Sequence, residues 1–196
     1  MREYVVRRAR VDDCAKLMPL IREFAVHEKA PPPTISTEDI REDTFGINAC
    51  QTIYIAEYVT PSGDSGLADA PEGAGSRAKE IIGFTSVSYL YSVFTGRVGY
   101  LNALYLKEGH RGFRLGTALM KEITKECLSS GGKLLNWDVL GWHDDTKRFY
   151  SKIGATNLSE TKQWEYMQLQ RDDLQKFAYD TELRCPPGVS ITFNPD

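Results

Sequence analysis

The segment from residue 100 to residue 120 constrains the fold and function of this chain more than any other. An apolar, strand-like run stops at Lys107-Glu108-Gly109, a loop bearing Arg111, Gly112, Arg114 and Gly116 follows, and a helical pattern begins at Thr117. A helix N-terminus attracts anions through free backbone N–H groups, glycine allows a close approach, and arginine adds paired donors. This order predicts a phosphate or pyrophosphate site. An ordinary strand-to-helix turn with exposed arginines is the alternative interpretation of the same spacing.

Length and composition argue against several classes of protein. The 196 residues fit one compact domain, and the net charge of −3 argues against a nucleic-acid partner. No apolar run approaches the ~20 residues of a membrane span, and the N-terminal residues lack the apolar stretch of a signal peptide, so we expect a cytoplasmic protein. Neither cysteines nor histidines show metal-site spacing, and Cys14 and Cys127 are expected to be buried thiols.

Hydrophobic periodicity predicts one sheet with helices on both faces. We expect strands over 5–9, 52–59, 81–91, 97–106, 134–140 and 163–169, and helices over 14–25, 37–45, 115–130 and 144–153. Expected N-caps are Asp12 or Asp13, Ser36, and Asp144 or Asp145. Segment 60–79, rich in small and polar residues, is expected to be a flexible loop at an enlarged hairpin tip. The order of elements predicts an α/β or α+β domain with a mixed sheet over 1–171, and an extension over 172–196 that either packs or is disordered.

Three parts of the chain match a known family. Arg111-Gly112-x-x-x-Gly116, with apolar residues on both sides, resembles the acetyl-CoA pyrophosphate loop of the GNAT superfamily of N-acetyltransferases. Segment 140–155 resembles the family's later strand and helix, in which a tyrosine precedes a Gly-Ala turn. Segment 6–29, together with Trp164, is similar to the diamine branch, which comprises the spermidine/spermine and thialysine N-acetyltransferases. The resemblance extends over residues 4–170 and implies the GNAT fold.

The resemblance implies acetyl-CoA as the donor and no metal. In the GNAT fold two neighbouring parallel strands splay apart, the pantetheine arm enters between them, and the glycine loop binds the pyrophosphate. Arg114 stands where the family often has glycine, and its side chain either turns outward or contacts a phosphate. The implied cofactor-binding residues are Leu104, Tyr105, Leu106, Arg111, Gly112, Phe113, Arg114, Leu115, Gly116, Thr117, His143 and Tyr150.

Two side chains in the later segment are candidates for proton transfer. Tyr150 matches the family tyrosine near the thioester sulfur, where a phenol protonates the leaving thiolate or donates a hydrogen bond to it. The alternative for Tyr150 is a purely structural role in the core. His143 takes the place of a family asparagine near the cofactor arm, where it either helps to move a proton or caps the following helix.

The substrate side departs from the family pattern. The Glu-Asp pair of the diamine branch is Asn102-Ala103 here, and two further acids are replaced by Gly141 and Lys162. Asp138 is an acid that this chain has gained. If its side chain faces the cleft, it binds a cation or removes a proton; the alternative is an acid on the solvent edge of the sheet without such a role. We therefore expect a primary amine less cationic than a polyamine. The catalytic candidates are Tyr150, Asp138 and Asn102, and the substrate-binding candidates are His27, Glu28, Asn102, Asn136, Trp137 and Asp138.

These residues predict an N-acetyltransferase that transfers acetyl from acetyl-CoA to a small amine by direct attack in a ternary complex. No cysteine stands at the loop or pocket positions that a covalent acyl-enzyme would need. A non-catalytic acyl-CoA-binding module, favoured by Asn102, and an acetyltransferase of protein amino groups are the alternatives. By analogy with the diamine branch we expect a homodimer.

Overall fold

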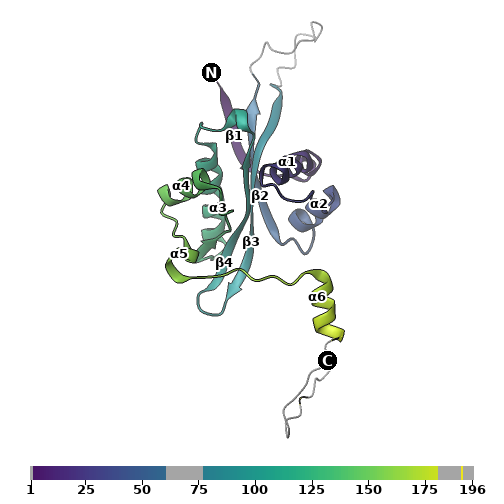
Figure 1. The fold of residues 1–196 in the computed structure, drawn as a ribbon. Coiled ribbons are helices and arrows are strands. Elements are labelled where there is room, and N and C mark those ends of the chain that lie inside the picture. The colour runs from purple at the N-terminus through teal and green to yellow at the C-terminus, as the bar shows by residue number, and fades with distance from the viewer. Residues whose placement is uncertain (1, 61–76, 181–190, 192–196) are drawn as a thin grey trace. The chain divides into compact units, whose positions relative to one another are not determined.

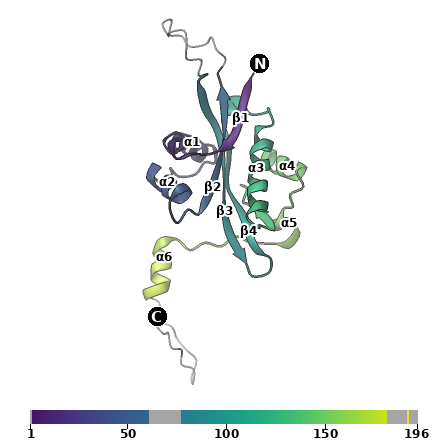
Figure 2. The same ribbon diagram turned by 180° about the vertical axis from the view of Figure 1, so that it is seen from behind.

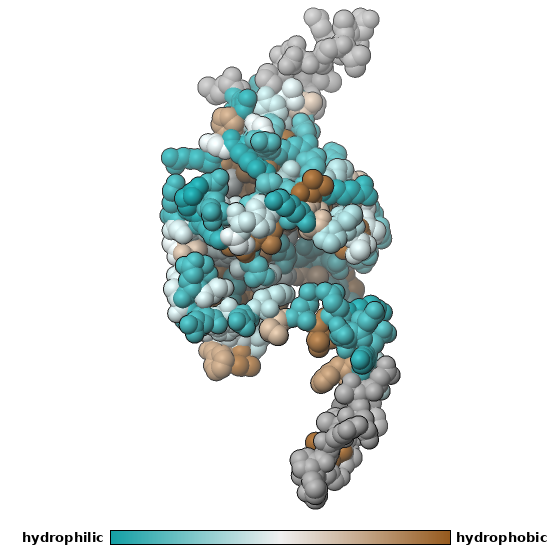
Figure 3. All heavy atoms as spheres, viewed as in Figure 1, coloured by the Kyte–Doolittle hydropathy of each residue, from teal (hydrophilic) through white to brown (hydrophobic). Residues whose placement is uncertain are grey.

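The computed structural model describes residues 2–60, 77–180 and residue 191. It divides into two compact units, Met1–Trp142 and His143–Asp196, and each is described by itself. The expected single domain over 1–171 stays a prediction. In the described residues no helix is long and apolar enough to cross a membrane. On the face drawn in Figure 3 hydrophilic side chains predominate and hydrophobic ones form small separate patches.

A mixed sheet of five strands forms the centre of the first unit, as the sequence predicts (Figure 1). Its order in space is the order in the chain, with β1–β2, β2–β3 and β3–β4 antiparallel and β4–β5 parallel. The strands are β1 Glu3–Arg8, β2 Gln51–Val59, β3 Lys79–Ser92, β4 Gly96–Leu106 and β5 Leu134–Asn136. The loop expected over 60–79 does join two antiparallel strands, and residues 61–76 lie outside the described residues.

Helices cover both faces of this sheet, which confirms the predicted layers. Figures 1 and 2 show α1 (Cys14–His27) and α2 (Thr37–Phe45) on one face and α3 (Leu115–Ser129) on the other. Ser36 caps α2 as expected: its side chain accepts from the Asp39 backbone N–H, and the Asp39 side chain accepts from that of Ser36. The expected thiols Cys14 and Cys127 are buried; Cys185 lies outside the described residues.

Two apolar clusters, one on each face, follow from the alternation of side chains along the strands. In β2, Ile53 and Ile55 face α1 and α2, whereas Ala56 faces α3. The cluster under α3 contains Ala56, Ile82, Leu115 and Leu119. The cluster under α1 and α2 contains Ala9, Cys14, Leu17, Met18, Leu20, Ile40, Ile53, Ile55, Ile81, Phe84 and Tyr105.

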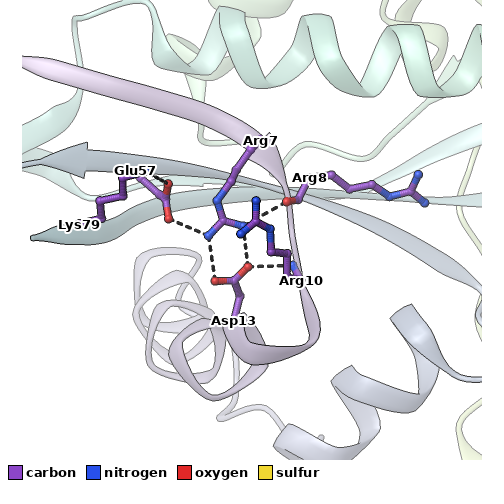
Figure 4. Close-up of polar contacts among 6 residues, drawn as sticks. All are labelled: Arg7, Arg8, Arg10, Asp13, Glu57 and Lys79. Atoms are coloured by element: carbon purple, nitrogen blue, oxygen red, sulfur yellow. Dashed lines mark hydrogen bonds and ion pairs between the residues drawn. The ribbon is translucent and has the colours of Figure 1, made fainter. Parts of the chain in front are cut away.

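Asp13 is the N-cap residue of α1, as predicted, but its side chain makes no capping bond, because it belongs to a partly buried ion cluster (Figure 4). Arg7 on β1 donates to both carboxylate oxygens of Asp13, at 2.7 and 3.0 Å, and to Glu57 on β2 at 2.7 Å. The Arg10 backbone N–H also donates to Asp13, at 2.8 Å. Burial raises the pKa of Asp13, but the hydrogen bonds from Arg7 and Arg10 outweigh it and hold that pKa below its usual value. The cluster fixes the start of α1 against the first two strands.

Two sequence predictions of strands are wrong. The strand expected over 134–140 ends at Asn136, which is the last residue of this segment that pairs with β4. The strand expected over 163–169 is absent: a period-two pattern needs a neighbouring strand to pair with, and no described strand pairs with this segment. The second unit instead contains α4 (Asp144–Lys152), α5 (Leu158–Lys162), α6 (Arg171–Gln175) and a single π-helical turn, Lys176–Asp180. Asp144 and Asp145 lie in the first turn of α4, whose N-cap is His143.

Candidate active site

The parallel strands β4 and β5 separate after a short ladder. They pair only at Val98–Leu134, Gly99–Leu135 and Tyr100–Asn136. Beyond that point the pairing of β3 with β4 skips Asn102, since Ser86 pairs with Ala103 but Val87 pairs with Leu101. Asn102 is therefore the extra residue of a β-bulge, which increases the twist and bends the strand. As a result no described strand lies beside β4 from Leu101 to Leu106 on the β5 side.

The backbone direction along β4 shows which groups face this opening. The Lys107 N–H donates to the Ile82 carbonyl on β3 at 2.9 Å, so the backbone of Lys107 points toward β3. Because consecutive residues of a strand point their backbone groups to opposite sides, Tyr105 also faces β3, whereas Leu104 and Leu106 face the opening. The Leu106 carbonyl accepts from Arg111 Nε at 2.9 Å, which draws this arginine back across the end of β4.

The glycine loop leads into an α3 N-terminus without a side-chain cap. Gly112 has a φ of +84°, and Arg114, the N-cap residue, has a left-handed backbone with a φ of 62°. No side chain caps α3 and its first turn contains no acid. The first N–H groups of a helix have no partner within the helix. The N–H groups of Leu115, Gly116 and Thr117 therefore remain available to an anion, as does the positive end of the helix dipole.

An aromatic cluster braces the glycine loop, and the sequence analysis missed it. The Tyr4 hydroxyl is hydrogen bonded to His110 Nδ1 at 3.2 Å. The rings of Tyr58 and His110 lie 5.3 Å apart, and those of Tyr4 and Phe113 lie 5.9 Å apart. The Arg2 guanidinium lies 4.8 Å from the centre of the Phe113 ring. The ends of β1 and β2 thus hold the loop through its His110 and Phe113 side chains.

The C-terminal part of α3 is held to the sheet by a carboxylate. Glu126 accepts from the Tyr54 hydroxyl at 3.0 Å and from Thr52 Oγ1 at 3.4 Å, and Arg8 lies 3.8 Å away. Burial and the bond to Glu126 raise the pKa of Tyr54 to about 12. Because both ends of α3 are tied to β1 and β2, its N-terminus is held in a defined position relative to the end of β4.

Polar side chains line the opening on the face that α1 covers. Tyr100 donates from its hydroxyl to the Asp138 carboxylate, and Ser88 Oγ donates to Asn102 Oδ1 at 2.9 Å. Asn136 pairs with Tyr100, and paired residues project to the same face. Of these residues the sequence analysis identified Asn102, Asn136 and Asp138. It missed Tyr100, because only the register of β4 and β5 shows that Tyr100 lies beside the acid.

The C-terminal end of α1 reaches the same region. The His27 ring lies 6.2 Å from the ring of Tyr105 on β4. The Tyr105 hydroxyl donates to Glu23 at 3.3 Å. Burial first, and then the negative charge of Glu23, raise the pKa of Tyr105. Glu28 is the C-cap residue of α1, and Lys29 Nζ lies 4.3 Å from the centre of the Trp142 ring.

Comparison with known families decides the class of the protein. The sequence model of the acetyltransferase (GNAT) family matches residues 35–155. The chain belongs to this family. Members of the GNAT family use acetyl-CoA as the acetyl donor, so the chain is an acetyltransferase.

Individual relatives agree with this assignment. The mouse thialysine N-epsilon-acetyltransferase is 29% identical over 174 residues, which cover 88% of this chain and 96% of the relative. The human spermidine/spermine N(1)-acetyltransferase-like protein 1 is 24% identical and matches 90% of this chain but only 24% of its own length. An integron cassette protein of V. cholerae has a TM-score of 0.63 at 17% identity, covering 90% of this chain and 98% of its own. The ribosomal-protein-alanine N-acetyltransferase of Brucella melitensis has a TM-score of 0.57 at 16% identity, covering 86% and 99%. The two solved structures show that the acetyltransferase has the GNAT fold.

Two candidate residues of the acetyltransferase belong to the second unit. Tyr150 lies on α4 and is buried, with 8% of its surface exposed. His143 is the N-cap residue of α4 but makes no side-chain capping bond. The helix ends at the Gly-Ala turn that the sequence indicates: Gly154 has a φ of +91°, and the Ala155 N–H donates to the Tyr150 carbonyl at 3.1 Å. The catalytic and cofactor roles of Tyr150 and His143 stay predictions.

Proposed function

We propose that this acetyltransferase transfers the acetyl group of acetyl-CoA to a primary amine of a small molecule, by direct attack within a ternary complex. The observation that carries the proposal is the opening between β4 and β5, with a hydrogen-bonded carboxylate on one face and the uncapped N-terminus of α3 beyond its end. The names of relatives that acetylate thialysine support a small amine as the acceptor.

The donor would bind along the open edge of β4. Leu104 and Leu106 face the opening, and the Leu104 N–H and carbonyl are suited to bind the pantetheine amides in place of a neighbouring strand. The pyrophosphate would rest on the amides from Gly112 to Thr117, where the helix dipole and Arg114 supply positive charge. This arrangement fits an extended chain that ends in a compact dianion.

The chemistry requires two proton transfers. The amine nitrogen forms a bond to the thioester carbon, the carbon–sulfur bond breaks, the amine loses a proton and the CoA thiolate gains one. In our proposal Asp138, oriented by the Tyr100 hydroxyl, accepts the proton from the amine. Tyr150 donates a proton to the thiolate, and the Leu104 N–H stabilises the oxyanion.

The acceptor pocket would be formed by His27, Glu28, Asn102, Asn136, Trp137 and Asp138. Asn102 donates and accepts hydrogen bonds but carries no charge, so this pocket is less acidic than a polyamine requires. A non-catalytic acyl-CoA-binding module is the second candidate, because the amide of Asn102 occupies the bulge where a base would otherwise stand.

Acetyl-CoA-dependent release of CoA across an amine panel tests the proposal. The panel contains spermidine, putrescine, lysine, thialysine, simple monoamines and a peptide N-terminus, each at pH 7 and pH 9. Turnover of one small amine that falls sharply in Asp138→Asn and Tyr150→Phe supports the proposed enzyme. Acetyl-CoA binding with no turnover of any amine would favour the binding module, and preferred turnover of the peptide would favour a protein substrate. Spermidine turnover far above that of every other amine would contradict the proposed acceptor class.

A further inference from the structure

We infer that Lys29 is a recognition residue for the acceptor, and that the acceptor carries a carboxylate besides its reactive amine. The inference rests on the proposed function, because it names the class of amine that the same site takes. It starts from the contact of Lys29 Nζ with the Trp142 ring, 4.3 Å from the ring centre. At this distance the indole face attracts a cation.

The contact lies beside the opening between β4 and β5. Lys29 follows His27, whose ring is near that of Tyr105 on β4. Trp142 lies four residues after Asp138 in the segment between β5 and α4. The Asp138 carboxylate accepts a hydrogen bond from Tyr100 on β4. Both sides of the opening are therefore tied to β4 within a few residues of the lysine–tryptophan pair. The Lys29 ammonium stands at the edge of the proposed acceptor pocket.

The charge of Lys29 is not neutralised by a carboxylate. Lys107 and Lys125, by contrast, are paired with glutamates at 2.8 and 2.7 Å. Lys29 is exposed, and within the part of the chain that the structure describes no acid lies within ion-pair distance of its Nζ. An ammonium has three N–H donors, and its attraction to an aromatic ring does not take up these donors as a bond to a carboxylate would. Lys29 can therefore donate to an incoming anion without leaving Trp142.

The backbone fixes the direction from which Lys29 approaches. Its φ of 55° is left-handed, which costs a residue other than glycine about 1 kcal/mol. The Lys29 N–H donates to the Val26 carbonyl, and the Ala30 N–H donates to the Ala25 carbonyl, so the turn at the end of α1 is closed on both sides. Holding the cation before the ligand arrives lowers the entropy lost on binding.

The chemistry that complements this site is an amine with a carboxylate at its other end. A second ammonium on the acceptor would be repelled by Lys29, whereas a carboxylate would form a charge-assisted hydrogen bond with it. The pocket contains the acids Glu28 and Asp138, but the neutral Asn102 and Gly141 add no further acid that would offset the repulsion. An amino acid with a side-chain amine satisfies both ends of the pocket: its amine reacts near Asp138, and its carboxylate binds Lys29 without changing.

Three acceptors with the same reactive amine test the inference: lysine, lysinamide and 1,5-diaminopentane. We expect the wild-type kcat/KM for lysine to exceed the other two by about tenfold, the size of one charged hydrogen bond. Lys29→Met should bring the ratio to about one, chiefly by raising KM for lysine, and Lys29→Arg should keep the preference. Trp142→Leu should weaken the preference and Trp142→Phe should retain most of it. Lys125→Met, which removes the same charge from α3, is the matched control and should change nothing.

Two outcomes overturn the inference even when the enzyme is active: equal use of the three acceptors by the wild type, or an unchanged ratio in Lys29→Met. If no amine is turned over, the proposed function fails separately. Calorimetric titration of lysine and lysinamide into the CoA-bound protein then decides the inference. Stronger binding of lysine that Lys29→Met abolishes supports it, and equal binding of the two overturns it.

Discussion

Tyr100 and Asp138 are joined by a hydrogen bond at the point where β4 and β5 separate. The acid stands two residues beyond the last paired residue of β5, and the tyrosine belongs to the last paired position of β4. The bond spans the start of the opening and holds the carboxylate on the face where the amine is expected. The same two residues provide the most direct test of the proposed proton transfer.

Asp138→Asn should reduce kcat by about 100-fold, because a positioned general base contributes at least that factor. Tyr100→Phe should reduce kcat less, since it removes only the group that orients the carboxylate. Steady-state kinetics with the best amine of the panel measures both. If Asp138 is the base, the activity lost in Asp138→Asn should recover partly at pH 9, where more of the amine is already neutral. Asp43→Asn, an exposed acid on α2, is the control, and equal losses in Asp43→Asn and Asp138→Asn would refute the assignment.

Arg114 has a left-handed backbone, and we propose that its side chain contributes to the binding of acetyl-CoA. Arg114→Gly should increase the free energy of unfolding by up to about 1 kcal/mol, because glycine adopts a left-handed backbone without a steric penalty. The same change should raise KM for acetyl-CoA several-fold, by roughly the loss of one phosphate contact of about 1 kcal/mol. Arg114→Ala keeps the strain and removes the charge, so it should raise KM without the gain in stability. An unchanged KM in both variants would mean that the side chain turns outward.

Asp13 should make stability depend on pH in the acid range. Its pKa is lowered in the folded protein, so its contribution is complete above its unfolded value of about 3.9 and is lost as the pH falls through the lower folded value. Asp13→Asn should cost about 3 kcal/mol at neutral pH, since it removes one of the two carboxylates that bind Arg7. Urea denaturation between pH 7 and pH 3 measures the effect. In Asp13→Asn the stability should fall less steeply with acid than in the wild type, and Asp12→Asn should behave as the wild type does.

The second unit exposes a row of large apolar side chains, and we propose that they form part of a homodimer interface. Trp164, Tyr166 and Met167 are 66%, 78% and 84% exposed. Such exposure in a segment that pairs with no described strand is typical of an interaction surface. Light scattering after size exclusion should show a dimer that Trp164→Lys with Met167→Lys converts to a monomer. Phe94→Lys, at the exposed turn between β3 and β4, should leave the dimer intact, and dissociation by Phe94→Lys alone would place the interface there.

Local patterns predict this fold well wherever a segment carries its own signal. The capping signal at Ser36, the helical periodicity of α3 and the strand over 52–59 all depend on neighbours in sequence, and the structure confirms them. The predictions over 134–140 and 163–169 fail because a strand also needs a partner, and partners are set by distant residues. The bond from Tyr100 to Asp138 and the brace between Tyr4 and His110 depend on register and on loop packing, so no local pattern indicates them.

The bulge at Asn102 has a consequence for how such a protein is stabilised. Without the extra residue, β4 could continue to pair with the chain beyond Asn136, and the sheet would gain hydrogen bonds. It would also close the opening. Deleting Asn102 should therefore produce a protein that melts at a higher temperature and no longer binds acetyl-CoA. The extra residue on β4 leaves part of the sheet edge unpaired, and in our proposal the extended arm of acetyl-CoA binds there in place of a strand.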